Sequence, residues 1–103
     1  MFFEIPIGRK VLLYTRPINM RWGDKKLSKL CKEELDKDPD EQKEVFVFTN
    51  SKKDQIAIFY VDNIGPTLFS KLLNDKTFIF PAPENDDQIS IEISGKLLLK
   101  LLR

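Results

Sequence analysis

The chain has 103 residues, 42% of them hydrophobic and 11% aromatic, which predicts one globular domain spanning residues 1–103 with its own core. Its formal net charge is +1, histidine is absent and Cys31 is the sole cysteine, so an internal disulfide and the usual zinc sites are excluded. No apolar run approaches the roughly 18 residues of a membrane span. The sequence therefore predicts a cytoplasmic protein with no metal, no cofactor and no membrane partner.

Charge is unevenly distributed along the chain. Residues 8–32 carry eight basic side chains and one acidic side chain, whereas residues 33–44 carry seven acidic and two basic ones. Residues 82–93 add four acids and no base. This asymmetry favours a partner that binds in one orientation, although a solvated surface of mixed charge would have the same composition.

The first third of the chain is predicted to form a strand and a long helix. Residues 10–15 contain consecutive β-compatible side chains, and the Arg-Pro pair that follows ends this strand because proline cannot donate to a ladder. Asn19 or Asp24 can cap a helix that runs to about Lys37 and stops before the next proline. At helical spacing, apolar residues fall on one face of this helix: Met20, Gly23, Leu27, Leu30, Cys31 and Leu35.

The middle of the chain predicts antiparallel strands. Residues 45–49 and 56–61 are short apolar runs, and the polar break between them is too brief for a crossover helix. Residues 67–73 fit either a helix or a strand, because periodicity does not decide the structure of so short a segment. Residues 77–80 are predicted to form another strand.

The C-terminal part predicts one more strand and a short helix. Apolar and polar side chains alternate over residues 89–93, a pattern typical of a strand with one solvated face. Ser94 can cap a helix over residues 95–103, whose five leucines exceed the needs of one buried stripe. These leucines either pack in the core or form an oligomer contact, with Leu98, Leu101 and Leu102 as candidate partner-binding residues. The predicted fold class is α+β, an antiparallel β-meander sheet packed with one main amphipathic helix and a short C-terminal helix.

No catalytic constellation is found in the sequence. Because histidine is absent, the commonest general base is missing. The sequence also has no glycine-rich phosphate loop. Asp54, Asp62 and Asp75 lie where turns are expected, and aspartate is a common turn residue. Cys31 lies on the apolar face of the predicted helix and is interpreted as a core residue.

The opposite face of that helix is the candidate binding surface. Its basic side chains, Arg21, Lys25, Lys29 and Lys32, could neutralise a row of phosphates, and Trp22 could stack on a base or sugar. The alternative is a solvated helix face, with Trp22 tucked into the core ahead of a helix that starts at Asp24.

Several short sequence boxes occur in a characteristic order along nearly the whole chain. They are Pro17 followed by Asn19-Met20-Arg21-Trp22-Gly23, then Asp38-Pro39, Phe46-Val47-Phe48, Lys52-Lys53-Asp54, Phe59-Tyr60-Val61-Asp62 with Gly65, Lys71-Leu72-Leu73, Phe78-Ile79-Phe80-Pro81, and Ser94 with the spacing of Leu98, Leu101 and Leu102. This order resembles the TnpB accessory-protein family of bacterial insertion sequences of family sixty-six, which is unrelated to the RNA-guided nucleases of that name. The chain departs from the family pattern at Asn19, Trp22, Leu72 and Phe80, where the family usually has Asp, Lys, Arg and Trp.

The resemblance implies a bacterial protein that is encoded beside a transposase and is needed for efficient movement of the element. Strand-transfer chemistry would belong to the separate transposase, so we expect a non-enzymatic accessory protein that contacts element DNA, the transposase complex or both. The alternative is a protein–protein adaptor with no nucleic-acid contact, whose surfaces are the acidic stretch 33–44 and the leucine-rich end.

Overall fold

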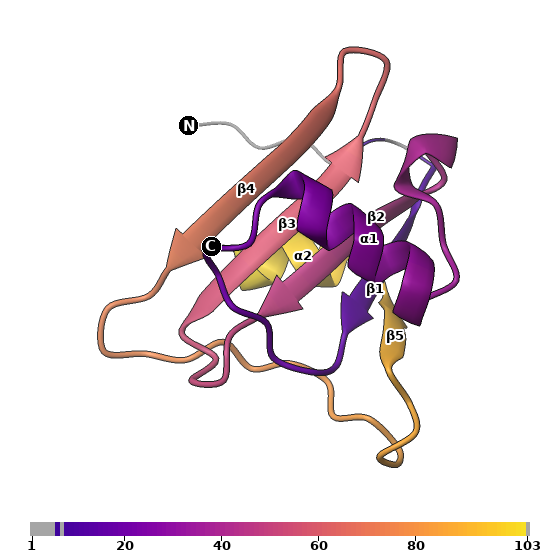
Figure 1. The fold of residues 1–103 in the computed structure, drawn as a ribbon. Coiled ribbons are helices and arrows are strands. Elements are labelled where there is room, and N and C mark those ends of the chain that lie inside the picture. Colours follow the sequence, from indigo (N-terminus) through magenta and orange to yellow (C-terminus); the bar gives the residue numbers. More distant parts are fainter. Residues whose placement is uncertain (1–5, 7, 103) are drawn as a thin grey trace.

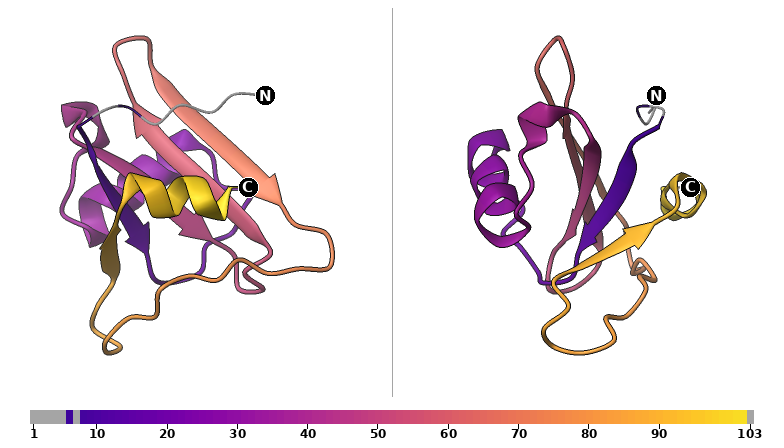
Figure 2. Two further views of the ribbon diagram at one scale, coloured as in Figure 1. Left: turned by 180° about the vertical axis from the view of Figure 1, so that it is seen from behind. Right: turned by 90° about the vertical axis from the view of Figure 1, so that its right-hand side faces the viewer.

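The fold is a five-stranded sheet with one α-helix on each face, as Figures 1 and 2 show. The computed structural model describes residues 6 and 8–102. Its elements follow in the order β1 (Lys10–Tyr14), α1 (Asp24–Glu34), the 3₁₀ helix η1 (Pro39–Glu41), β2 (Glu44–Thr49), β3 (Gln55–Val61), β4 (Pro66–Leu72), β5 (Ser90–Ile93) and α2 (Gly95–Leu101). None of the helices in this part of the chain has the length and apolar character needed to cross a membrane.

The strand order across the sheet is β4-β3-β2-β1-β5. The pairs β4·β3, β3·β2 and β1·β5 are antiparallel, so the α+β prediction with a mainly antiparallel sheet is confirmed. The central pair differs from the predicted meander, because β1 and β2 run parallel with Lys10 opposite Glu44. The connection between these two strands contains α1 and is long enough for the crossover that a parallel pair requires.

Two segments in the second half of the chain, 67–73 and 77–80, had apolar patterns, but only the first forms a strand. Residues 67–72 of the segment 67–73, which fitted a helix or a strand, lie in β4 at the edge of the sheet, and Leu73 follows the strand. The strand predicted for residues 77–80 is wrong, because this segment has no regular secondary structure. Its apolar pattern reflects the burial of Phe78, whose N–H donates to the Lys53 carbonyl at 2.7 Å in the β2–β3 turn.

Helix α1 starts at Asp24, the later of the two predicted starts, and ends at Glu34 rather than at about Lys37. Its N-cap is Gly23, and Asn19 instead uses its side-chain oxygen to accept the Arg21 N–H at 2.9 Å in a turn before the helix. At the other end Asp36 adopts a left-handed conformation with φ of 53°, and the Lys37 N–H bonds the Cys31 carbonyl at 3.0 Å. This bond closes the helix at Glu34, ahead of the proline that was expected to stop it.

The core is divided into two clusters by the sheet. On the α1 face, Phe46, Phe48 and Phe59 pack against Leu27 and Cys31 of the helix. The residues that fill the α2 face include Val45, Val47, Ile56, Ile58, Phe78 and Leu98. All six residues of β2 are buried, because β2 is central in the sheet and is covered on both faces.

Helix α2 begins as predicted at a Ser94 cap, where the Leu97 N–H donates to Ser94 Oγ at 3.0 Å. Leu98 is 0% exposed and packs in the core, whereas Leu101 and Leu102 are half-buried at the rim of the same cluster. Leu98 therefore offers no surface to a partner in this fold. Partner binding through Leu101 and Leu102 stays a prediction.

The buried thiol of Cys31 makes a pH-dependent contribution to stability. Burial, and secondarily the charge of Glu44, raises the pKa of Cys31 from 9.0 to about 12. The unfolded chain loses this proton first, so the contribution is fully present below pH 9 and is lost as pH rises from 9 to about 12.

We expect the urea midpoint to fall over that pH interval and to fall less steeply in Cys31→Ala. A residual slope is expected in the variant, because burial and the Glu34 hydrogen bond raise the pKa of Tyr14 to about 12. Equal slopes in the two proteins would contradict the assignment to Cys31.

Candidate functional site

A groove lies between helix α1 and the β3–β4 side of the sheet. It has a volume of about 440 Å³, and its helix wall includes Lys25, Lys29 and Lys32. These three residues are spaced four and three apart, which places them on one flank of a helix. Phe59, Val61 and Pro66 contribute the apolar side of the groove. The structure thus brings three of the four predicted basic residues to one concave surface.

The lysines of this groove differ in their pairing. Lys29 Nζ lies 3.9 Å from Glu33 Oε1, an exposed pair one helical turn apart. Within the described part of the chain, Lys25 and Lys32 have no ion pair, so their ammonium groups are available to a ligand. Asp24 and Asp40 also line the groove and reduce its positive charge.

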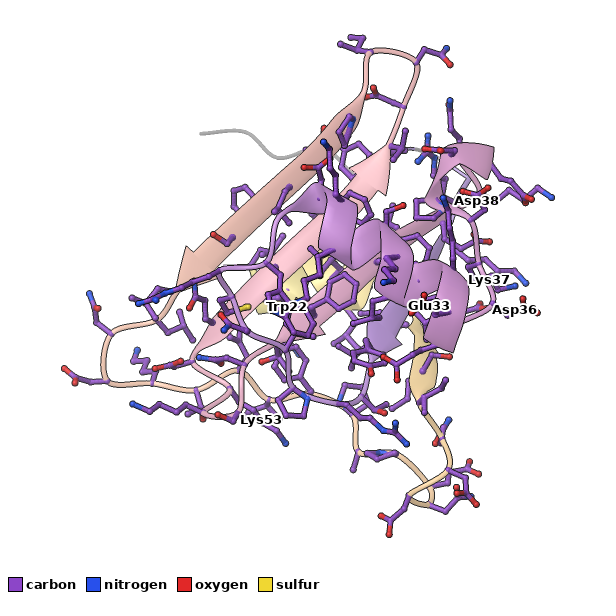
Figure 3. The ribbon with its side chains drawn as sticks, in the orientation of Figure 1. Trp22, Glu33, Asp36, Lys37, Asp38 and Lys53 are labelled. Carbon is purple, nitrogen blue, oxygen red and sulfur yellow. The ribbon has the colours of Figure 1, made fainter. Side chains whose placement is uncertain are left out.

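Trp22 and Arg21 lie outside this groove, because helix α1 starts only at Asp24. Trp22 is half-buried against the α1-face cluster, beside the helix as Figure 3 shows. Lys26 Nζ sits 4.5 Å from the centre of its ring, a cation–π contact. A base could stack on that face only by displacing Lys26. Arg21 is exposed in the turn that precedes the helix.

A second basic hollow was not predicted from the sequence. It has a volume of about 530 Å³, and its charged lining residues are Arg9, Lys10, Lys37, Lys43 and Glu44. Parallel pairing of β1 and β2 places the starts of both strands side by side, which gathers cations that are far apart in the chain. The sequence indicated this hollow only through Lys37 and Lys43, the two lysines inside the acidic stretch 33–44. Where these side chains lie depends on the relative direction of β1 and β2, which the sequence did not predict.

A hydrogen bond joins a residue of the second hollow to Val61 of the groove. This residue lines the groove beside α1, and its carbonyl oxygen accepts a 2.7 Å hydrogen bond from Arg9 Nη1. The Arg9 guanidinium also lies 5.8 Å from the centre of the Tyr60 ring. Arg9 is therefore held in place by one backbone contact and one aromatic contact, both to β3.

Two of the three carboxylates that were interpreted as turn residues accept hydrogen bonds within their turns. Asp54 Oδ1 accepts from Asn50 Nδ2 at 2.6 Å, and Asp62 Oδ1 accepts from the Ile64 N–H at 2.9 Å. Asp75 adopts a left-handed conformation with φ of 60°. Over residues 6 and 8–102, no group of three or more His, Cys, Asp or Glu residues is placed to hold a metal ion.

Comparison with known proteins gives one match. No curated protein and no solved structure matches the chain significantly. The model of the IS66 Orf2-like protein family matches residues 9–102, which include every helix and strand of the fold. The chain therefore belongs to the IS66 Orf2-like family, whose members are accessory proteins of insertion-sequence transposition.

Proposed function

We propose that this protein is a non-enzymatic, cytoplasmic accessory protein that contacts the phosphate backbone of element DNA through the groove beside α1. The observation that carries the proposal is the convergence of Lys25, Lys29 and Lys32 on one concave surface, with Lys25 and Lys32 free of ion pairs within the described residues. Backbone contacts of this kind supply affinity without reading sequence.

The second basic hollow extends the proposed contact. Lys10, Lys37 and Lys43 add a second positive surface, which the Arg9–Val61 hydrogen bond links to the groove, and we expect an extended phosphate chain to contact both hollows. Among the described residues, Lys43 and Lys10 pair with exposed acids, Glu41 at 3.4 Å and Glu92 at 3.9 Å respectively. Such surface pairs are weak and exchange readily for phosphate.

The roles of Trp22 and Arg21 change within this proposal. Trp22 anchors the entry to α1 by packing on the core, and its cation–π contact holds Lys26 over the ring. Arg21 is exposed in the preceding turn, and we propose that it makes an outlying phosphate contact. We therefore expect Arg21→Glu alone to reduce DNA affinity less than reversal of a lysine in the groove.

The test is a salt titration of duplex DNA binding, with a triple variant that reverses Lys25, Lys29 and Lys32 to glutamate. We expect at least about a tenfold loss of affinity and a log–log salt slope that is shallower by about 2.7, since each lost phosphate contact removes about 0.9. The matched control reverses three exposed lysines elsewhere, Lys52, Lys76 and Lys96, with the same change of net charge. Equal losses in both triples, or affinity independent of salt, would refute a DNA contact at this groove.

A protein–protein adaptor is the second candidate function. It is favoured by Asp24 and Asp40, which place negative charge in the wall of the same groove. Figure 3 shows further acidic side chains, Asp36 and Asp38, beyond the end of α1. Co-purification with a transposase that survives the lysine triple but is lost on neutralising the acidic stretch 33–44 would select this function.

A further inference from the structure

The β4 edge of the sheet is long, regular and unpaired within the described residues. Strand β4 has seven residues, and in Figure 1 and the left view of Figure 2 no described segment lies beyond it. The other edge, β5, has four residues and includes the charged Glu92. Short, charged edge strands disfavour pairing with a strand of another chain, whereas long, uncharged edge strands favour it.

The backbone direction of β4 follows from its ladder with β3. Leu73 N–H donates to the Asp54 carbonyl at 2.8 Å, and the same register continues through Leu72 opposite Gln55. Odd-numbered residues therefore turn their N–H and C=O groups toward β3, and even-numbered residues turn theirs outward. The outward N–H donors are those of Leu68, Ser70 and Leu72.

These same three residues have exposed side chains. Leu68 is 42% and Leu72 is 58% exposed, and Ser70 lies between them. Leu68 is opposite Phe59, a residue of the α1-face cluster, so the three side chains lie on the α1 face of the sheet. The outward positions read Leu–Ser–Leu, which is the same in both directions along the strand.

We propose that two copies of this chain associate by antiparallel pairing of their β4 strands about a two-fold axis at Ser70. In this register each Ser70 faces the other, and Leu68 of one copy faces Leu72 of the other. Each of the three positions is a hydrogen-bonded pair, so all outward N–H groups from Leu68 to Leu72 find a carbonyl. The exposed leucines are buried against one another across the seam.

The charges of β4 suit a second copy as the occupant. None of the outward-facing residues of β4 is charged, so pairing about the two-fold axis brings no like charges face to face. Lys71, the sole charged residue of β4, lies on the other face, where its Nζ donates to the Leu102 carbonyl. A self-complementary pattern is what an isologous interface requires, since each side presents the same surface to the other.

The size of this surface sets the expected strength of association. Two paired edges of this length bury less than the roughly 1,200 Å² of a small stable interface, so the dimer is expected to form at micromolar rather than nanomolar concentration. A two-fold axis perpendicular to the sheet keeps both α1 helices on one face. The basic grooves of the two copies then open on the same side of a continuous sheet.

The first measurement is the molar mass by sedimentation velocity from about 1 µM to about 1 mM. The mass should rise with concentration from that of the 12.1 kDa chain to twice that value. Ser70→Pro should abolish this rise, because it removes an outward N–H and leaves the β3 ladder intact. Ser70→Ala keeps the N–H and should dimerise like the wild type. A monomer at every concentration, or a dimer unaffected by Ser70→Pro, would overturn the proposal.

A charge exchange tests the register without proline. The double variant Leu68→Glu/Leu72→Glu opposes like charges at both outer positions and should weaken dimerisation at least tenfold. The double variant Leu68→Lys/Leu72→Glu opposes opposite charges at those positions and should dimerise more tightly than the first. Both change two exposed residues, so the monomer fold is retained. Equal dimerisation in the two variants would place the contact elsewhere and contradict this register.

Discussion

Replacing Phe46 by alanine should lower the free energy of unfolding by about 3–5 kcal/mol, the range for removing a buried phenylalanine. Phe46 is 0% exposed in the central strand β2, and its ring centre lies 6.3 Å from that of Phe59 on the neighbouring strand. The side chain is covered by α1, so its removal leaves a cavity between helix and sheet. Small domains are stable by about 5–15 kcal/mol, and this loss removes a large share of that margin.

Urea denaturation of the wild type, Phe46→Ala and Phe46→Leu measures this effect. Phe46→Leu retains much of the buried apolar volume and should lose less than half as much stability as the alanine variant. A fall in the urea midpoint at unchanged m-value would show that stability changed and that the unfolded state did not. A loss below about 1 kcal/mol in Phe46→Ala would contradict the packing of the α1-face cluster.

The sequence was informative where the signal is local. The strands β2 and β3 were predicted nearly in full, because both are apolar on both faces and are bounded by polar turns. The parallel pairing of β1 with β2 was not predicted, since strand direction depends on how the chain between them crosses the sheet. The second basic hollow was missed for the same reason.

In the candidate site, too, the features that depend on local sequence were predicted and those that depend on the tertiary fold were not. The positions of Lys25, Lys29 and Lys32 on one flank followed from helical periodicity, which is a property of the helix alone. The placement of Arg21 and Trp22 depended on where α1 begins, and helix boundaries are set by backbone caps that several nearby residues could supply. The groove itself needed β3 and β4 as its other wall, which no local pattern specifies.

The two neighbouring leucines Leu98 and Leu99 of helix α2 should respond very differently to alanine. Leu98 is 0% exposed and lies in the α2-face cluster, so Leu98→Ala should cost about 2–5 kcal/mol of unfolding free energy. Leu99 is 47% exposed, and Leu99→Ala should cost less than about 1 kcal/mol. Leucine and alanine both favour helix, so propensity contributes little to the difference. Equal costs would mean that α2 does not pack through Leu98.

The same pair of variants tests whether the sheet couples its two faces. Trp22 is the sole tryptophan and packs on the α1 face, whereas Leu98 packs on the α2 face. If both faces unfold as one unit, Leu98→Ala should shift the Trp22 fluorescence transition and the far-UV circular dichroism transition to the same urea concentration. If α2 instead detaches alone, the fluorescence midpoint should stay at the wild-type value while the dichroism signal changes earlier. Because β2 and β3 contribute buried side chains to both faces, loss of Leu98 weakens the strands on which α1 rests, and we expect a single shared transition.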